Sequence, residues 1–187
     1  AANASMLSLL GDFPVMEKYE NADTLAERVG KAVAKLSSLQ REDGGWSWFE
    51  GMNANRYISI CVCECLAQLP SLDDEQADML RRGMEYLDSV ELAEYKHIRK
   101  RTKSIVLGND RMRYLGLVSQ VDALGLDGYR PAKAVLDMRK WYVGFLGKEV
   151  DRLTIYGMAR SACILRDNGE DKAADKLVAR LRDYTVA

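Results

Sequence analysis

One dense group of acidic residues in the sequence has the composition for acid chemistry. Asp73, Asp74, Glu75 and Asp78 lie close together, just after Pro70. A terpene cyclase needs an acid of this kind in a deep apolar cavity, where it protonates an alkene or ionises a diphosphate. However, this group stands where a helix is expected to begin, and acidic residues there cap free N–H groups and favour the helix dipole. We therefore interpret the group as a helix cap.

The cysteines and the single histidine are the residues that a zinc site would require. Cys61, Cys63 and Cys65 alternate along the chain, whereas Cys163 and His97 lie far from them. On a helix such close neighbours cannot form a disulfide, and zinc sites usually space their ligands differently. We interpret the cysteines as reduced, buried apolar residues and His97 as a surface residue, and we expect no metal or other cofactor.

A basic run covers residues 96–103, around His97. The whole chain has a formal net charge of -1, and the run has no interleaved aromatic platform. Nucleic-acid binding is therefore not expected, and a solvated segment between helices is the preferred interpretation. No apolar run approaches the roughly 20 residues of a membrane span.

Helical periodicity dominates the whole chain and positions these groups. Helices are expected at residues 24–39, 56–69, 110–124, 153–165 and 171–184. Another is expected from Asp73 or Asp74 to about residue 90, and it either continues or restarts over 91–98. One more is expected from Pro131 to about residue 146. The helices at 56–69 and 153–165 are apolar nearly all round, which indicates burial on every side, whereas the others are amphipathic. This alternation predicts an all-α fold of stacked αα-hairpins in two layers, either an α/α toroid or a solenoid. No repeat of fixed length is present, which argues against tetratricopeptide and HEAT arrays.

The segment LQREDGGWSWFEG, residues 39–51, interrupts this pattern. Asp43, Gly44 and Gly45 favour a sharp turn with positive φ. Trp46 and Trp48, two residues apart in an extended segment, are expected to point the same way and to cover neighbouring helix ends as one apolar plug. Gln40 is expected to bond free groups at a helix terminus, and the segment would thus fix one hairpin against the next.

These residues resemble a known motif. Gln40 followed by Asp43-Gly44-Gly45-Trp46 is similar to the glutamine–tryptophan motif of α/α-toroid proteins, which include triterpene cyclases, protein prenyltransferases and the thioester domains of the alpha-2-macroglobulin and complement family. The longer stretch LQREDGGWSWFEGMNANRYIS, which includes Trp48 and Phe49, and the CLAQL that ends the next helix are most similar to bacterial alpha-2-macroglobulins. Residues 156–184, YGMARSACILRDNGEDKAADKLVARLRDY, also resemble that thioester domain.

The resemblance implies that residues 1–187 are a single helical domain, or an incomplete piece of a thioester-type toroid, terpenoid cyclase-like in fold. The implied function is scaffold or contact surface of a protease-trapping inhibitor, with target proteases and the parent's other domains as partners. The implied location is the periplasm or the cell surface. The family's reactive Cys-x-Glu-Gln is not in this chain: Asp73 stands where Glu75-Gln76 would need a cysteine, and Cys63-Glu64-Cys65 lacks the glutamine. The motif is either on a preceding part of a longer parent or absent from that parent. Since the chain begins Ala1-Ala2 without an initiator Met, we expect a processed product or a fragment.

Two other classes of function stay open. A lipid-processing enzyme of the terpene cyclase or prenyltransferase type would have a deep cavity lined by aromatic residues, with an acid at its floor. A plain helical interaction scaffold would have a broad apolar groove and no reactive group. The family resemblance favours a domain without catalysis of its own.

Overall fold

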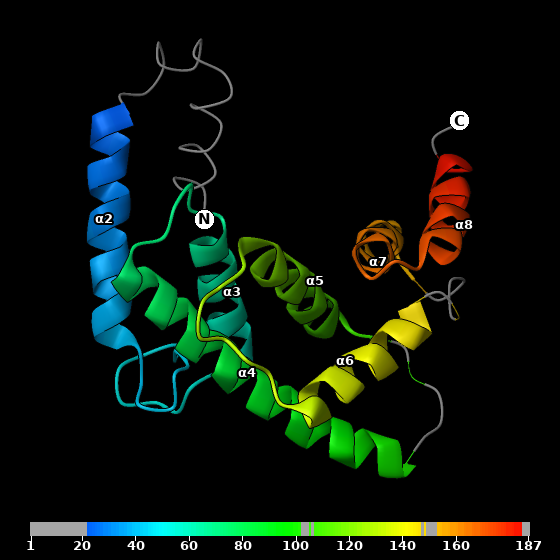
Figure 1. Ribbon diagram of the computed structural model, residues 1–187, viewed down its shortest axis with the longest axis horizontal. Helices are drawn as coiled ribbons and strands as arrows, with labels where there is room; N and C mark the ends of the chain where they lie inside the picture. The colour runs from blue at the N-terminus through cyan, green and yellow to red at the C-terminus, as the bar shows by residue number, and fades with distance from the viewer. Residues whose placement is uncertain (1–21, 102–104, 106, 147, 149–152, 185–187) are drawn as a thin grey trace. The chain divides into compact units, whose positions relative to one another are not determined.

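A computed structural model describes residues 22–101, 105, 107–146, 148 and 153–184 of the chain. Over these ranges it contains α-helices and no β-strand (Figure 1). The all-α class predicted from the sequence is therefore confirmed. The helices are α2 (Ala22–Leu39), α3 (Arg56–Ala67), α4 (Asp74–Arg101), α5 (Asn109–Leu124), α6 (Lys133–Leu146), α7 (Ile155–Asp167) and α8 (Asp171–Arg182).

The chain divides into two compact units. The first comprises Ala1–Leu87 and Leu126–Tyr129, and the second comprises Asp88–Gly125 and Arg130–Ala187. Helix α4 is continuous, so the restart considered near residue 91 does not occur, and its two ends belong to different units.

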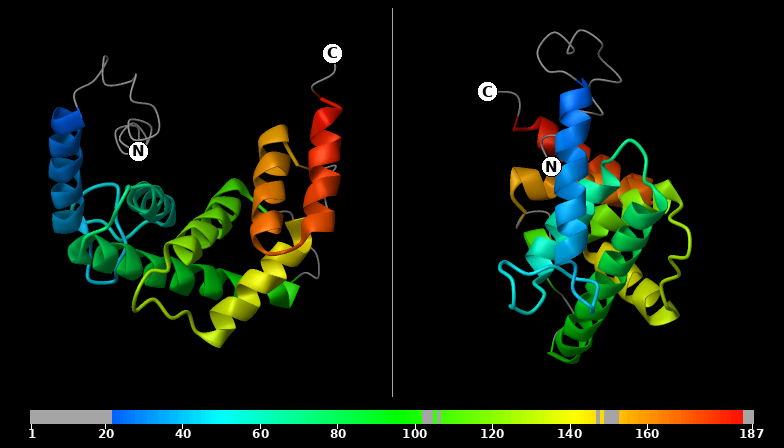
Figure 2. Two further views of the ribbon diagram at one scale, coloured as in Figure 1. Left: turned by 45° about the horizontal axis from the view of Figure 1, so that its top comes forward. Right: turned by 90° about the vertical axis from the view of Figure 1, so that its left-hand side faces the viewer.

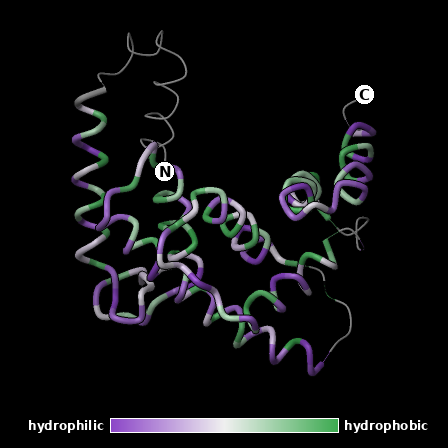
Figure 3. The backbone as a smooth tube through the Cα atoms, viewed as in Figure 1, coloured by the Kyte–Doolittle hydropathy of each residue, from purple (hydrophilic) through white to green (hydrophobic). Residues whose placement is uncertain are grey.

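The first unit consists of α2, α3, the beginning of α4 and a short segment after α5. Apolar residues recur along each helix, as the colouring in Figure 3 shows, and those that face inward form the core. Asn55 caps α3 by accepting a hydrogen bond from the Ile58 N–H at 3.2 Å. The fully buried members of this core are Leu25, Trp46, Ile60, Leu66, Leu80, Met84 and Leu87.

The second unit contains the rest of α4 together with α5, α6, α7 and α8. Helices α7 and α8 pack side by side in both views of Figure 2. Gly169 between them has a φ of +74°, and the Glu170 N–H bonds the Leu165 carbonyl at 2.8 Å. This is the left-handed helix end that Asn168-Gly169 predicts. The fully buried members of this core include Tyr114, Leu117, Met138, Tyr142 and Met158.

Burial differs from the sequence-based expectation on two helices. Helix α3 buries one side, most of its other residues are half-buried, and its Tyr57 is 43% exposed, so its predicted burial on every side is wrong. On α7 the side chains of Ile155, Tyr156 and Cys163 are all exposed, so its predicted burial on every side is wrong. An apolar composition on all sides of a helix does not ensure burial on all sides. A face is buried only where another element packs against it. Across the described residues, the structure has no helix with the length and apolarity of a membrane span.

Candidate functional site

The turn after α2 is the part of the first unit that the sequence singled out. Gly44 has a φ of +86°, and its N–H bonds the Arg41 carbonyl at 2.9 Å. A Cβ atom on Gly44 would overlap the Arg82 carbonyl oxygen and lie 2.8 Å from the Arg82 carbonyl carbon. Carbon atoms pack at roughly 3.5–4.0 Å, so only glycine fits here without movement of α4. The predicted positive φ is confirmed, and the close approach to α4 is a second reason for the glycine.

Gln40 connects this turn to α4. Its side-chain Nε2 donates to the Gly44 carbonyl and to the Met79 carbonyl, at 2.9 Å each. The Arg82 guanidinium of α4 donates in turn to the Arg41 carbonyl at 2.9 Å. Gln40 was predicted to bond free groups at a helix terminus; it bonds backbone carbonyls, but one lies in the turn and the other within α4, so the predicted place is wrong.

Trp46 fastens three helices together and is only 2% exposed. Its indole N–H donates to the Leu36 carbonyl of α2 at 2.8 Å, and its backbone N–H donates to Ser59 Oγ of α3 at 2.9 Å. Its ring lies against Gly83 of α4, where an added Cβ would be 2.8 Å from the ring atom Cζ3. We call Gln40, Asp43, Gly44, Gly45 and Trp46 the helix staple.

The other two staple residues shape the turn. Asp43 Oδ1 accepts a hydrogen bond from the Gly45 N–H at 3.0 Å. A Cβ atom on Gly45 would lie 2.7 Å from Ala54 Cβ and 2.8 Å from the Tyr86 ring. Both glycines of the motif therefore stand at points where the turn touches neighbouring elements.

Trp48 was predicted to form one plug with Trp46, and this prediction is wrong. Trp48 is 57% exposed and Phe49 is 71% exposed. The prediction assumed an extended chain, but the backbone turns here: Ser47 Oγ and the Met52 N–H both donate to the Phe49 carbonyl, at 2.7 and 3.2 Å. Trp46 points inward as predicted. Trp48 instead stacks on Tyr57, with ring centroids 6.0 Å apart and planes 12° from parallel.

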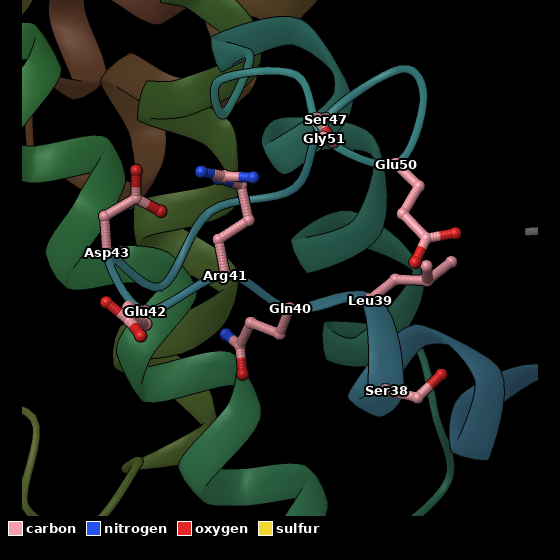
Figure 4. Close-up of a pocket in the computed structure, with 9 residues that line it drawn as sticks. All are labelled: Ser38, Leu39, Gln40, Arg41, Glu42, Asp43, Ser47, Glu50 and Gly51. Carbon is pink, nitrogen blue, oxygen red and sulfur yellow. The ribbon is translucent and has the colours of Figure 1, made fainter.

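A surface pocket of about 660 Å³ lies beside this turn (Figure 4). Three acidic residues and one basic residue are among those that line it. The Nε of Arg41 is buried and has no hydrogen-bond partner among the described residues. The lining consists of Ser38, Leu39, Gln40, Arg41, Glu42, Asp43, Ser47, Glu50 and Gly51.

The other residues considered for function lie on other elements, and the acidic group stands at the start of α4, where Glu75 accepts a hydrogen bond from Ser37 Oγ of α2 at 2.7 Å. Asp73 and Gln76 exchange bonds across the start of α4, with the Gln76 N–H 2.8 Å from Asp73 Oδ1 and the Asp73 N–H 3.2 Å from Gln76 Oε1. This is a capping box, so the capping interpretation of the acidic group is confirmed at Asp73. His97 and the described part of the basic run are largely exposed, and Lys103 lies outside the described residues.

The cysteines are free thiols with different environments. Cys63 is fully buried, and burial raises the pKa of its thiol far above the ordinary value. Cys61 and Cys65 are half-buried, and Cys163 is exposed, so the prediction of buried thiols holds for Cys63 and is wrong for Cys163. No cluster of potential metal ligands occurs within the part of the chain that the structure describes.

A buried polar cluster in the second unit escaped the sequence reasoning. Asp88 Oδ1 accepts from Tyr114 Oη at 2.5 Å and from the Arg139 guanidinium at 2.7 Å, and Arg139 Nε donates to Tyr114 Oη at 3.0 Å. Burial, together with the Asp88 carboxylate, raises the pKa of Tyr114 well above its ordinary value. The sequence does contain one sign of this cluster. Asp88 directly follows Leu87 of the apolar stripe of α4, and a charged side chain at a buried position requires a partner.

Beside this cluster is a second pocket, of about 420 Å³, to which Asp122 and Arg139 contribute polar groups and Leu115 and Val143 apolar ones. The Asp122 side chain is exposed, yet neighbouring atoms displace part of its water and raise the pKa of its carboxyl, against the opposing effect of Arg139. The cluster of Asp88, Tyr114 and Arg139 contains a buried ion pair, and its hydrogen bonds link α4, α5 and α6.

Comparisons of the chain with protein-family models, with curated protein sequences and with solved structures find no match.

Proposed function

We propose that this chain is a helical scaffold and contact domain of an alpha-2-macroglobulin-like protease-trapping protein. Its helices would belong to a toroid of αα-hairpins, and the reactive chemistry, where present, would lie elsewhere in the parent. The parent would act in the periplasm or on the cell surface, with proteases as its targets. The chain itself would perform no catalysis.

The geometry of the helix staple is the observation that carries this proposal. Gln40 and Trp46 are the residues of the resembled motif, and each one spans different helices: Gln40 reaches α4, and Trp46 bonds α2 and α3. A side chain that bonds backbone groups of neighbouring helices fixes their spacing, which stacked hairpins require. Gln40 and Trp46 thus link neighbouring helices, which supports a stack of hairpins.

The acidic residues support a scaffold more than a cyclase. Asp73 is engaged as a helix cap at the start of α4 and is exposed. A cyclase would need such an acid at the floor of an apolar cavity. The pocket beside the staple is instead open to the surface and carries three carboxylates. A plain interaction scaffold is the second candidate, and the exposed Trp48 and Phe49 favour it.

The test uses the longer parent protein that the proposal implies. It is incubated with an active protease, with the same protease blocked at its active site, and separately with methylamine, and intact masses and complex sizes are measured. A complex that forms only with active protease is the expected result. A methylamine adduct together with a new free thiol would place a thioester in the parent. The absence of any protease complex would overturn the proposal and leave the plain scaffold.

A further inference from the structure

The loop between Trp46 and Asn55 concentrates exposed apolar side chains in the first unit. Phe49, Trp48 and Met52 are each more than half exposed. Tyr57, which stacks on Trp48, and Leu39 at the end of α2 are also exposed, at 43% and 38%. We call these five residues the aromatic loop surface. Concentrated exposed apolar area of this kind marks interaction sites in soluble proteins.

The staple does not need these side chains. The hydrogen bonds described above that join the turn to α2, α3 and α4 come from Gln40, Trp46, Ser59 and Arg82. The exposed aromatic residues contribute none of these hydrogen bonds, although Trp48 stacks on Tyr57 of α3. Tryptophan, tyrosine, phenylalanine and methionine are the residues enriched at protein interfaces.

The loop is held in shape before any partner arrives. The Asn55 N–H bonds the Trp46 carbonyl at 2.7 Å and closes the base of the loop. The bonds from Ser47 and Met52 to the Phe49 carbonyl fix its tip. A preformed loop loses less conformational entropy on binding, which favours affinity.

The charges beside the loop indicate the chemistry of the partner. Glu42, Asp43 and Glu50 line the pocket, and Arg41 is the basic residue among its lining. We call the three carboxylates the acidic rim. In Figure 4 the Glu50 side chain extends toward Leu39, so the rim meets the aromatic loop surface there. A negative rim attracts cationic groups and repels anionic lipid headgroups and nucleic acid.

We infer that the aromatic loop surface and the acidic rim form a docking site for a basic, apolar polypeptide segment of a partner protein. Apolar side chains of that segment pack on Trp48 and Phe49, and its lysine or arginine side chains pair with Glu42 and Glu50. This inference deepens the contact role in the proposed function. Its test uses this chain by itself, so loss of docking and loss of protease capture by the parent are separate results.

The experiment measures the binding of three fluorescent dodecapeptides by anisotropy. The first alternates lysine with leucine and phenylalanine, the second has glutamate in place of every lysine, and the third has serine in place of every apolar residue. Only the first is expected to bind the chain. Equal binding of the glutamate peptide would refute the inferred charge preference, and equal binding of the serine peptide would refute the apolar contact.

Matched variants locate the site. The double substitution W48A/F49A is expected to weaken binding of the first peptide at least about tenfold, as the loss of central aromatic contacts does. Leu136→Ala, which removes another exposed apolar side chain on α6, is expected to leave binding unchanged. Unchanged binding by W48A/F49A would overturn the inference.

Charge reversals test the rim in the same way. E42K/E50K is expected to weaken binding, whereas D137K/D167K, which alters the net charge equally at exposed positions on α6 and α7, is not. Equal losses of binding by both double variants would mean that only the overall charge matters, and this would overturn the inference. Vesicles of phosphatidylcholine are the last arm, since a membrane is the other surface that takes exposed aromatic residues. Vesicle binding that depends on Trp48 and Phe49, without peptide binding, would replace the polypeptide partner with a lipid surface.

Discussion

Gly44 and Gly51 provide a matched pair of substitutions for the helix staple. Both glycines have positive φ, +86° at Gly44 and +82° at Gly51. A Cβ atom on Gly44 would overlap the Arg82 backbone of α4, whereas nothing lies within 4 Å of a Cβ atom on Gly51. Gly44→Ala and Gly51→Ala therefore share the backbone strain and differ in the collision.

The magnitudes follow from these two contributions. An alanine at positive φ costs about 1–3 kcal/mol, and this strain applies to both variants. The gain from a less flexible unfolded chain, about 0.4–1 kcal/mol, is also shared. At Gly44 alone, α4 must move, and such overpacking costs about 1–3 kcal/mol more. The movement also strains the Gln40–Met79 and Arg82–Arg41 hydrogen bonds, each worth about 1 kcal/mol. We therefore expect Gly44→Ala to be less stable than Gly51→Ala by about 2–4 kcal/mol.

The assay is urea unfolding followed by circular dichroism and by tryptophan emission, with the free energy of unfolding taken from each midpoint and slope. Emission is informative because Trp46 and Trp48 both lie in the first unit. Equal destabilisation by the two substitutions would refute the reasoning, since it would mean that the approach of the turn to α4 contributes nothing.

Three further results are expected. Gly83→Ala should destabilise the chain by about 1–3 kcal/mol in urea unfolding, because the new Cβ would lie 2.6 Å from the Sγ atom of Cys63. Gly30→Ala on α2, with nothing within 4 Å, should instead stabilise it by about 0.5–1 kcal/mol, and the reverse order would contradict the packing described. Asp88→Ala should cost about 3–5 kcal/mol, since it leaves a buried guanidinium without its carboxylate, and a loss below about 1 kcal/mol would contradict a buried ion pair. In the native chain iodoacetamide should modify Cys163 rapidly and leave Cys63 unmodified, because burial raises the pKa of the Cys63 thiol and shields it from the reagent. Mass spectrometry of the digested peptides measures the modification of each cysteine. Rapid modification of Cys63 would contradict its burial.

The helices could be predicted from the sequence because their signals are local. Apolar spacing places the helix bounds to within a few residues, and Gly125 and Gly169 end α5 and α7 with the positive φ that their positions suggest. Part of the staple could also be predicted, because glycine at Gly44 favours a sharp turn between two helices and Gln40 can bond backbone groups there.

The remaining features depend on contacts between distant parts of the chain. Asp88 and Arg139 are 51 residues apart, and no local pattern pairs them. Whether Trp48 faces in or out depends on the hydrogen bonds that turn the chain at Ser47 and Phe49, and alternation along an assumed extended segment does not contain that information.

The two tryptophans of the motif show how one short segment supports two separate roles. Trp46 uses both its indole and its backbone N–H to bond neighbouring helices and is removed from water. Trp48, two positions later, contacts Tyr57 and remains accessible. Because the described hydrogen bonds of the staple involve no side chain of the loop tip, substitutions at Trp48 and Phe49 remove none of these bonds. In the docking that we infer, rigid attachment through Trp46 would present Trp48 to the partner segment.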